Sequence, residues 1–178
     1  MDKVVIRVAT TNDARAIRIV SKEAWVYTYP NEEYGITRDD LIARFTFSSR
    51  EEEEKHTRDR QKVISEDHNQ HYWVAETDNK IVGFCLAKKE AQTNVLQALH
   101  VLPGYQRLGI GKQLLTTALR WLGNEKQVKL NVVIYNKRAI TFYEKFGFNL
   151  TGKKVEENMT ILPSGRETPN VEMVLLHK

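Results

Sequence analysis

Hydrophobic and polar positions along this chain follow a helical period in some segments and the period of strands in others. Apolar residues recur three and four positions apart behind polar capping residues, which predicts helices. The expected helices are Thr10 to about Trp25, Thr37 through Phe45, Ser49–Glu66, Gly111 through Leu122, and Lys137–Phe146. Short apolar runs bounded by turn residues predict strands at Val4–Ala9, His71–Glu76, Lys80–Ala87, Val95–Val101, Val128–Ile134, Phe148–Ile161 and Val171–Leu176. No repeat or linker interrupts this order, so we expect one domain with a mixed α/β sheet and helices on its faces.

The composition narrows the class of protein. The chain has 178 residues, 41% of them hydrophobic, which suits one domain of ordinary size. No apolar run approaches the roughly 18 residues of a membrane span, and the N-terminal stretch is charged where a signal peptide would be apolar. We therefore expect a cytoplasmic protein with no membrane partner. The net charge of +4 comes without a basic run or recognition motif, so no nucleic-acid partner is expected.

Cysteine and histidine usage adds little chemistry. The single cysteine, Cys85, excludes an internal disulfide, and its apolar surroundings in the sequence favour a buried thiol. His56, His68 and His71 are scattered without the spacing of a ligand motif. We therefore expect no metal site.

The segment Leu99–Leu115 carries the strongest functional signal. An apolar strand is followed by a turn with basic and glycine residues, and a helix then begins. Unpaired amide groups and the positive end of the helix dipole favour an anion at such a place. Gly109 and Gly111 lack the Cβ atoms that would hold an anion away from the backbone, and Arg107 and Lys112 add positive charge. The segment predicts a site for a phosphorylated cofactor.

Two nucleotide-binding motifs do not fit this segment. A P-loop needs a lysine after its second glycine, where this chain has Ile110. The dinucleotide fingerprint needs a third glycine, where Leu114 stands. The run Gln106-x-x-Gly109-x-Gly111 resembles instead the pyrophosphate loop of the GNAT superfamily of acyl-CoA-dependent N-acetyltransferases.

A second segment resembles the same superfamily. Asn136–Phe148 matches the family's run Asn-x-x-Ala-x-x-Phe-Tyr-x-x-x-Gly-Phe, on a short helix capped by Asn136 and ended by Gly147. Core packing of a capped helix is the alternative explanation for its aromatic residues. The order of elements agrees along nearly the whole chain. The resemblance implies a GNAT-like fold, with a single domain over residues 1–178 and a mixed, mostly antiparallel sheet of about seven strands flanked by helices.

The resemblance also implies an activity and a site. Members of the family transfer an acetyl group from acetyl-CoA to an amine by direct attack, without an acyl-enzyme. Tyr143 matches the family's general acid. A phenol with a pKa near ~10 protonates a thiolate near ~8.5 only weakly, so a hydrogen bond to sulfur is the alternative role. The resemblance places the contacts to coenzyme A at Leu99, His100, Val101, Gln106, Arg107, Leu108, Gly109, Ile110, Gly111, Lys112, Asn136, Ala139 and Lys145.

The sequence does not identify the general base. Some family members have a glutamate at the start of the fourth strand, where this chain has Val95. The amine proton could instead be removed by Glu76, Glu32 or Glu33, by His100, or by a chain of water molecules. Alternatively, the site could bind the small neutral fraction of the amine.

The acceptor pocket in this family is walled by the first two helices and the final strand pair. In this chain those elements supply aromatic rings and carboxylates, which suit an ammonium-bearing substrate. The candidate residues are Trp25, Tyr27, Tyr29, Glu32, Glu33 and Tyr34. We expect a small amine such as a polyamine or an amino acid. The alternatives are a peptide or protein acceptor, a non-catalytic acyl-CoA-binding module, and aromatic residues that only pack against the sheet. Family members are often homodimers, but no interface is visible in the sequence.

Overall fold

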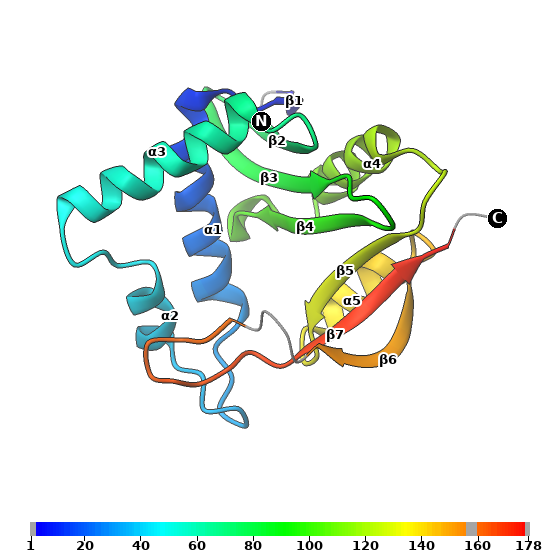
Figure 1. The fold of residues 1–178 in the computed structure, drawn as a ribbon. Helices are drawn as coiled ribbons and strands as arrows, with labels where there is room; N and C mark the ends of the chain where they lie inside the picture. The colour runs from blue at the N-terminus through cyan, green and yellow to red at the C-terminus, as the bar shows by residue number, and fades with distance from the viewer. Residues whose placement is uncertain (1–2, 156–159, 177–178) are drawn as a thin grey trace.

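The computed structural model describes residues 3–155 and 160–176, which contain one seven-stranded sheet (Figure 1). Its strands are β1 (Val5–Val8), β2 (Gln70–Thr77), β3 (Lys80–Lys88), β4 (Asn94–Val101), β5 (Val128–Val133), β6 (Asn149–Val155) and β7 (Asn170–Leu175). Among these described strands the order is β1-β2-β3-β4-β5-β7-β6, and every neighbouring pair is antiparallel except β4 and β5. The predicted fold class, a mostly antiparallel mixed sheet, is confirmed.

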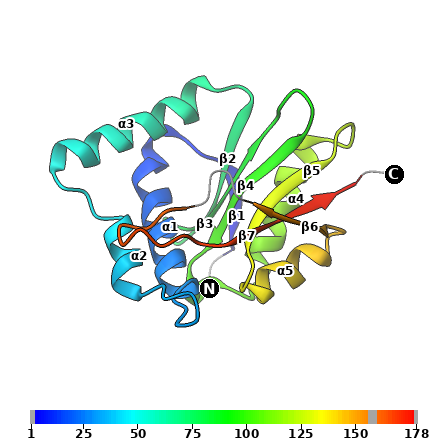
Figure 2. The ribbon, with the colours of Figure 1, turned by 60° about the horizontal axis from the view of Figure 1, so that its bottom comes forward.

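Helices lie on both sides of the sheet. Figure 2 shows α1, α2 and α3 on one side and α4 and α5 on the other. Their bounds are α1 (Ala14–Thr28), α2 (Arg38–Arg44), α3 (Arg50–Glu66), α4 (Ile110–Leu122) and α5 (Lys137–Glu144). None of the helices in the described part of the chain is long and apolar enough to cross a membrane.

Polar residues begin these helices as their sequence pattern predicts. The Thr10 amide donates to Asp13 Oδ2 at 2.7 Å and closes a capping box before α1. The side chains of Thr37 and Ser49 accept from backbone amides three residues on, at the starts of α2 and α3. These bonds satisfy amides that have no carbonyl partner in the first turn of a helix.

Boundaries of several elements differ from the sequence pattern, most of them by one residue. Helix α1 continues to Thr28, three residues beyond Trp25, because Tyr29 donates its amide to the Trp25 carbonyl and packs its ring 4.7 Å from that of Trp25. Helix α5 ends at Glu144, two residues early, ahead of Gly147 with φ +87°. The strand expected over Phe148–Ile161 is β6 as far as Val155, and residues 156–159 lie outside the described residues.

The two parallel strands separate soon after they begin. Pairing of β4 with β5 covers only Asn94 with Val128 and Val95 with Lys129. The Asn94 amide and side chain bind the carbonyls of Gln127 and Leu122, which anchors this end. A register shift against β3 between Leu86 and Ala87 then gives β4 an extra residue, and such a bulge bends a strand. The sheet thus divides into β1–β4 and β5–β7–β6, with their facing edges apart (Figure 1).

A second, smaller core connects the segment before β7 to the first two helices. Val26, Ile36, Leu41 and Leu162 are buried together, and Trp25, Tyr29, Tyr34, Ile42 and Tyr135 pack against them. The main core lies between the sheet and helices α1 and α4. The second core therefore positions residues 160–170 beside the opening between β4 and β5.

Candidate functional site

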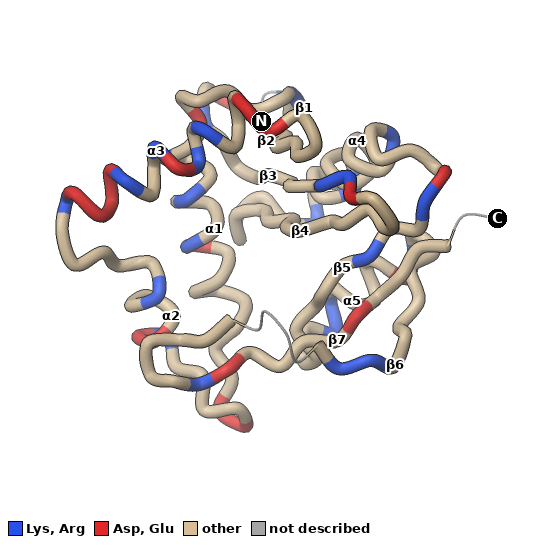
Figure 3. The backbone as a smooth tube through the Cα atoms, in the orientation of Figure 1, with Lys and Arg blue, Asp and Glu red and all other residues tan. Residues whose placement is uncertain are grey.

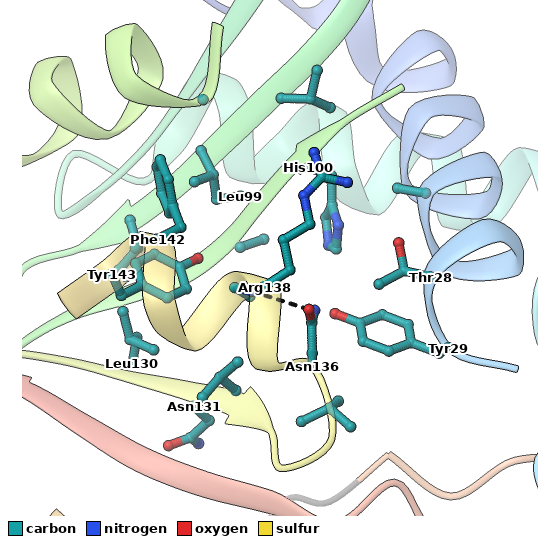
Figure 4. Close-up of a pocket in the computed structure, with 18 of the residues that line it drawn as sticks. Thr28, Tyr29, Leu99, His100, Leu130, Asn131, Asn136, Arg138, Phe142 and Tyr143 are labelled. Atoms are coloured by element: carbon teal, nitrogen blue, oxygen red, sulfur yellow. Dashed lines mark hydrogen bonds between the residues drawn. The ribbon is translucent and has the colours of Figure 1, made fainter. Parts of the chain in front are cut away.

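A cavity of about 940 Å³ lies where β4 and β5 diverge. Its wall combines the end of α1, the facing parts of β4 and β5, the start of α4 and helix α5 (Figure 4). Thr160, Thr168 and Asn170 complete the wall. Because the two strands are not paired here, backbone groups of β4 face the cavity rather than a neighbouring strand. The cavity follows directly from the division of the sheet.

One end of the cavity is formed by the loop that leads into α4. The first helical hydrogen bond runs from the Gln113 amide to the Gly109 carbonyl at 3.1 Å, so residues 110–112 have no carbonyl one turn earlier to accept from their amides. Gly109 has φ +80°, which favours glycine, and Arg107 has φ +64°. A positive φ is uncommon for a residue other than glycine, and residues with this conformation are often found at functional sites.

The glycines of this loop are not required by internal packing. A Cβ atom at Gly111 would come no closer than 3.7 Å to the Phe142 ring, an ordinary contact. At Gly104 and Gly109 a Cβ atom would meet nothing within 4 Å. Gly111 also has no left-handed φ that would demand glycine. What glycine provides at position 111 is open space in front of the backbone amides.

The charge of the cavity wall has one sign. Its described residues include five cationic side chains and no aspartate or glutamate; the cations are Arg107, Lys112, Lys137, Arg138 and Lys145. Arg138 donates to Gln106 Oε1 at 2.6 Å, and Gln106 Nε2 donates to the Val101 carbonyl at 3.0 Å. These bonds connect α5 to the loop and to the end of β4. The wall therefore favours a polyanion.

Hydrogen bonds also connect the end of α1 to the start of α5. Asn136 Oδ1 accepts from the Ala139 amide at 3.1 Å and caps α5, as Figure 4 shows. Burial raises the pKa of Tyr29, and a hydrogen bond from the Asn136 side chain opposes that rise. The Tyr135 hydroxyl donates to the Tyr29 carbonyl at 2.9 Å. The Tyr29–Asn136 contact thus joins two parts of the cavity wall, the end of α1 and the start of α5.

Two titratable residues of the wall are held uncharged by burial. Tyr143 packs edge-on against Phe142 and Phe148, with ring centroids 5.3 and 5.7 Å away, and burial raises the pKa of its hydroxyl. Burial lowers the pKa of His100 to about 4, and its ring centroid is 5.3 Å from that of Phe84. At neutral pH the site therefore presents a protonated phenol and a neutral imidazole.

A family model now accounts for this arrangement. Residues 35–148, well over half of the chain, match the acetyltransferase (GNAT) family. This chain belongs to the GNAT acetyltransferase family. The match includes residues 99–115 and 136–148, the two segments whose residues resemble the family. It also includes β4 and β5, between which the cavity opens.

Individual relatives are similar over parts of their length. An N-alpha-acetyltransferase from Sulfurisphaera tokodaii is 34% identical over 92 residues, which are 43% of this chain and 55% of that protein. Mycothiol acetyltransferase from Streptomyces avermitilis is 37% identical over 83 residues, 43% of this chain and 26% of that protein. The chain thus spans between a quarter and just over half of the length of these two curated relatives.

Solved structures share the fold over the full chain. The PaiA N-acetyltransferase from Thermoplasma acidophilum, solved in complex with coenzyme A, superimposes with a TM-score of 0.71. The alignment covers 98% of this chain and 99% of that one, at 22% identity. At this identity the likeness shows the GNAT fold alone.

Most residues that the sequence assigned to this GNAT site lie together in the structure. Tyr143 lines the cavity, and so do Leu99, His100, Val101, Gln106, Arg107, Gly109, Gly111, Lys112, Asn136, Ala139 and Lys145. Two of the expected coenzyme contacts are not part of the wall. The Leu108 side chain is 48% exposed, and the Ile110 side chain is buried in the main core, so only the backbone amide of Ile110 remains a possible contact.

The expected acceptor residues divide into two groups. Trp25 and Tyr29 line the cavity. Tyr27 is 61% exposed, and Tyr34 packs its ring 5.0 Å from that of Tyr135, so neither is in the wall. The described wall also lacks the three carboxylates considered as bases. Glu32 and Glu33 are exposed on the loop after α1, and Figure 3 shows this loop at the periphery of the molecule. Glu76 Oε2 forms an ion pair with Nε of Arg7, on strand β1, at 2.6 Å.

Sequence reasoning missed much of the opposite wall. Asn131, Thr160, Thr168 and Asn170 line the cavity but belong to no motif. The last three lie in or near the polar segment of residues 163–170, whose sequence carries no functional pattern. Lys137 and Arg138 also line it. Those two could have been found, because they directly follow the capping Asn136 in the second motif.

Proposed function

We propose that this chain transfers an acetyl group from acetyl-CoA to a primary amine by direct attack. The observation that carries the proposal is the cavity between β4 and β5. One end of this cavity has unpaired helix amides and cationic side chains, and the middle has a buried phenol. Family membership supports this chemistry, and the coenzyme A complex of the PaiA relative supports the choice of coenzyme.

The residues present fit coenzyme A. The amides of residues 110–112, the open space at Gly111, and Arg107 and Lys112 would bind the diphosphate. The unpaired edge of β4 at Leu99–Val101 would bind the amide-bearing arm of the coenzyme. When bound, acetyl-CoA supplies an acyl group activated as a thioester.

Tyr143 is the residue that we propose assists the departing sulfur. Its burial raises the pKa of the hydroxyl, so it stays protonated and can donate a hydrogen bond. Because its pKa lies above that of a thiol, near ~8.5, complete transfer of the phenol proton would be uphill. We therefore assign Tyr143 the role of hydrogen-bond donor to the thiolate, which favours the leaving group without losing its own proton.

The structure also bears on how the amine loses its proton. His100 has a pKa of about 4, so it is a weak base toward an ammonium ion. Within the described wall no carboxylate is available for this step. The remaining alternatives are a water molecule or binding of the amine in its neutral form. With either route, the rate depends on the fraction of the amine that is neutral, and therefore on the pKa of the amine itself.

The test is release of free thiol from acetyl-CoA across a panel of primary amines, with coenzyme affinity measured by calorimetry. We expect micromolar to submillimolar binding of acetyl-CoA and thiol release with at least one amine. Binding without release for every amine would instead indicate an acyl-CoA-binding module. Tight binding of ATP or NAD with no affinity for coenzyme A would overturn the proposal altogether.

A further inference from the structure

Tyr29, the residue that ends α1, brings a second phenol to the cavity. It lines the wall from α1, whereas Tyr143 reaches the cavity from α5. Figure 4 shows the two hydroxyl groups pointing into the cavity from opposite walls. Burial raises the pKa of Tyr143 most, and Cys85 and Tyr29 add to that rise, as charges close by would do. Tyr29 is only partly buried, so a bound ligand can reach it.

The position of Tyr29 is fixed by its backbone and by its ring. Its amide donates to the Trp25 carbonyl at 3.0 Å, and its carbonyl accepts from the Tyr135 hydroxyl at 2.9 Å. Its ring packs edge-on against that of Trp25, with the centroids 4.7 Å apart. The hydroxyl is therefore in place before any ligand binds, and a donor held in this way needs no reorganisation during a reaction.

The direction of the Tyr29 hydrogen follows from its bond with Asn136. Asn136 Oδ1 accepts from the Ala139 amide at the start of α5, so the Asn136 group that faces Tyr29 is Nδ2. An amide NH₂ only donates, and the Tyr29 oxygen is therefore the acceptor in this bond. Its hydrogen is not used there, and no described residue accepts it. Burial raises the pKa of Tyr29, so the hydroxyl keeps this hydrogen at neutral pH.

A thioester offers two atoms to such donors. Negative charge gathers first on the carbonyl oxygen and then on the sulfur, and both atoms are bonded to the same carbon. If Tyr143 donates to the sulfur, a second phenol in the opposite wall is placed for the oxygen. A hydrogen bond from Tyr29 to the amine nitrogen would instead occupy the lone pair that attacks. The carbonyl oxygen is therefore the productive acceptor for the Tyr29 hydrogen.

We propose that Tyr29 is a catalytic residue whose hydroxyl donates a hydrogen bond to the thioester carbonyl oxygen; this rests on the acetyl transfer proposed above. As the amine nitrogen adds to the carbonyl carbon, a C–N bond forms and an electron pair moves to the oxygen, where Tyr29 stabilises it. The C–S bond then breaks. The nitrogen loses one proton and the released thiolate gains one, so the step balances and Tyr29 keeps its own proton.

Tyr29→Phe tests the catalytic role by thiol release with the best amine of the panel. Phenylalanine keeps the ring beside Trp25 and both backbone hydrogen bonds, so the melting temperature should change little. We expect kcat to fall about 10- to 30-fold, less than for the loss of a sole donor, because unpaired amides of β4 remain. Affinity for coenzyme A and KM for the amine should stay within about twofold. Tyr27→Phe, on the same helix and 61% exposed, is the matched control and should leave every value unchanged.

The outcomes separate this inference from acetyl transfer itself. A normal kcat in Tyr29→Phe overturns the inference and leaves acetyl transfer standing. A change in coenzyme affinity or in the KM of the amine with normal kcat does the same, because Tyr29 would then bind the coenzyme arm or the acceptor. Thiol release with no amine of the panel defeats both.

The contact also has a signature that does not depend on turnover. A hydrogen bond to a carbonyl oxygen weakens the C=O bond and lowers its stretching frequency. Infrared difference spectroscopy of bound acetyl-CoA, isotopically labelled at the thioester carbonyl, measures this frequency with no amine present. We expect a higher frequency in Tyr29→Phe than in the unmodified protein, and no change in Tyr27→Phe. The same frequency in all three proteins would exclude the contact.

Discussion

The two ends of the cavity are built in different ways. The coenzyme end is made largely from backbone: amides of residues 110–112, the open space at Gly111, and the unpaired edge of β4. The acceptor end is made from side chains that come from α1, β5 and residues 160–170. A backbone site depends on local conformation, whereas a side-chain site depends on how distant segments pack. The first is typical of a whole family, and the second can change with the substrate.

The largest expected effect comes from placing a negative charge at the backbone end. In Gly111→Asp a carboxylate would stand beside the amides expected to bind the diphosphate, and we expect affinity for acetyl-CoA to fall at least about 50-fold. Calorimetry with acetyl-CoA measures this directly. Acceptor specificity, measured as the ratio of kcat/KM between two amines at saturating acetyl-CoA, should not change.

Gly104→Asp is the matched control for that variant. It adds the same carboxylate to the same loop, at a glycine that does not line the cavity and has open space around it. Its affinity for acetyl-CoA should stay within about twofold of the unmodified protein. If both variants weaken binding equally, the effect is general repulsion and the amides before Gln113 are not the binding groups.

A smaller effect is expected at Tyr143, which lies between the two ends. Tyr143→Phe removes the hydrogen-bond donor but keeps the ring packed against Phe142 and Phe148. We expect kcat to fall about 10- to 100-fold, less than for a full general acid because the proton is not transferred, with little change in affinity for acetyl-CoA. Tyr72→Phe, outside the cavity wall, is the control. Loss of affinity or of melting temperature with normal kcat would make Tyr143 a packing residue.

The contrast also explains what sequence reasoning could find. The coenzyme end lies in two continuous segments, and its glycines, cations and helix cap are visible as residue patterns. The divergence of β4 from β5 depends on a bulge against β3, which no periodicity shows. The place of Thr168 in the cavity wall depends on the small core around Leu162, which brings residues 160–170 to the end of α1. Such a contact joins residues more than a hundred positions apart, so local patterns cannot predict it.

The smallest expected effect tests whether the two ends are linked. Asn136 caps α5 and its side chain also contacts Tyr29. Asn136→Ser keeps a capping oxygen and loses the donor to Tyr29, so the melting temperature should change little. Asn136→Ala also loses the cap and should cost about 1 kcal/mol of unfolding free energy in a urea titration. In the serine variant we expect KM for acetyl-CoA and for the amine to rise together, about two- to fivefold, because Tyr29 is then no longer held beside α5. A change in only one of these two constants would show that Asn136 serves one end, and that the ends act independently.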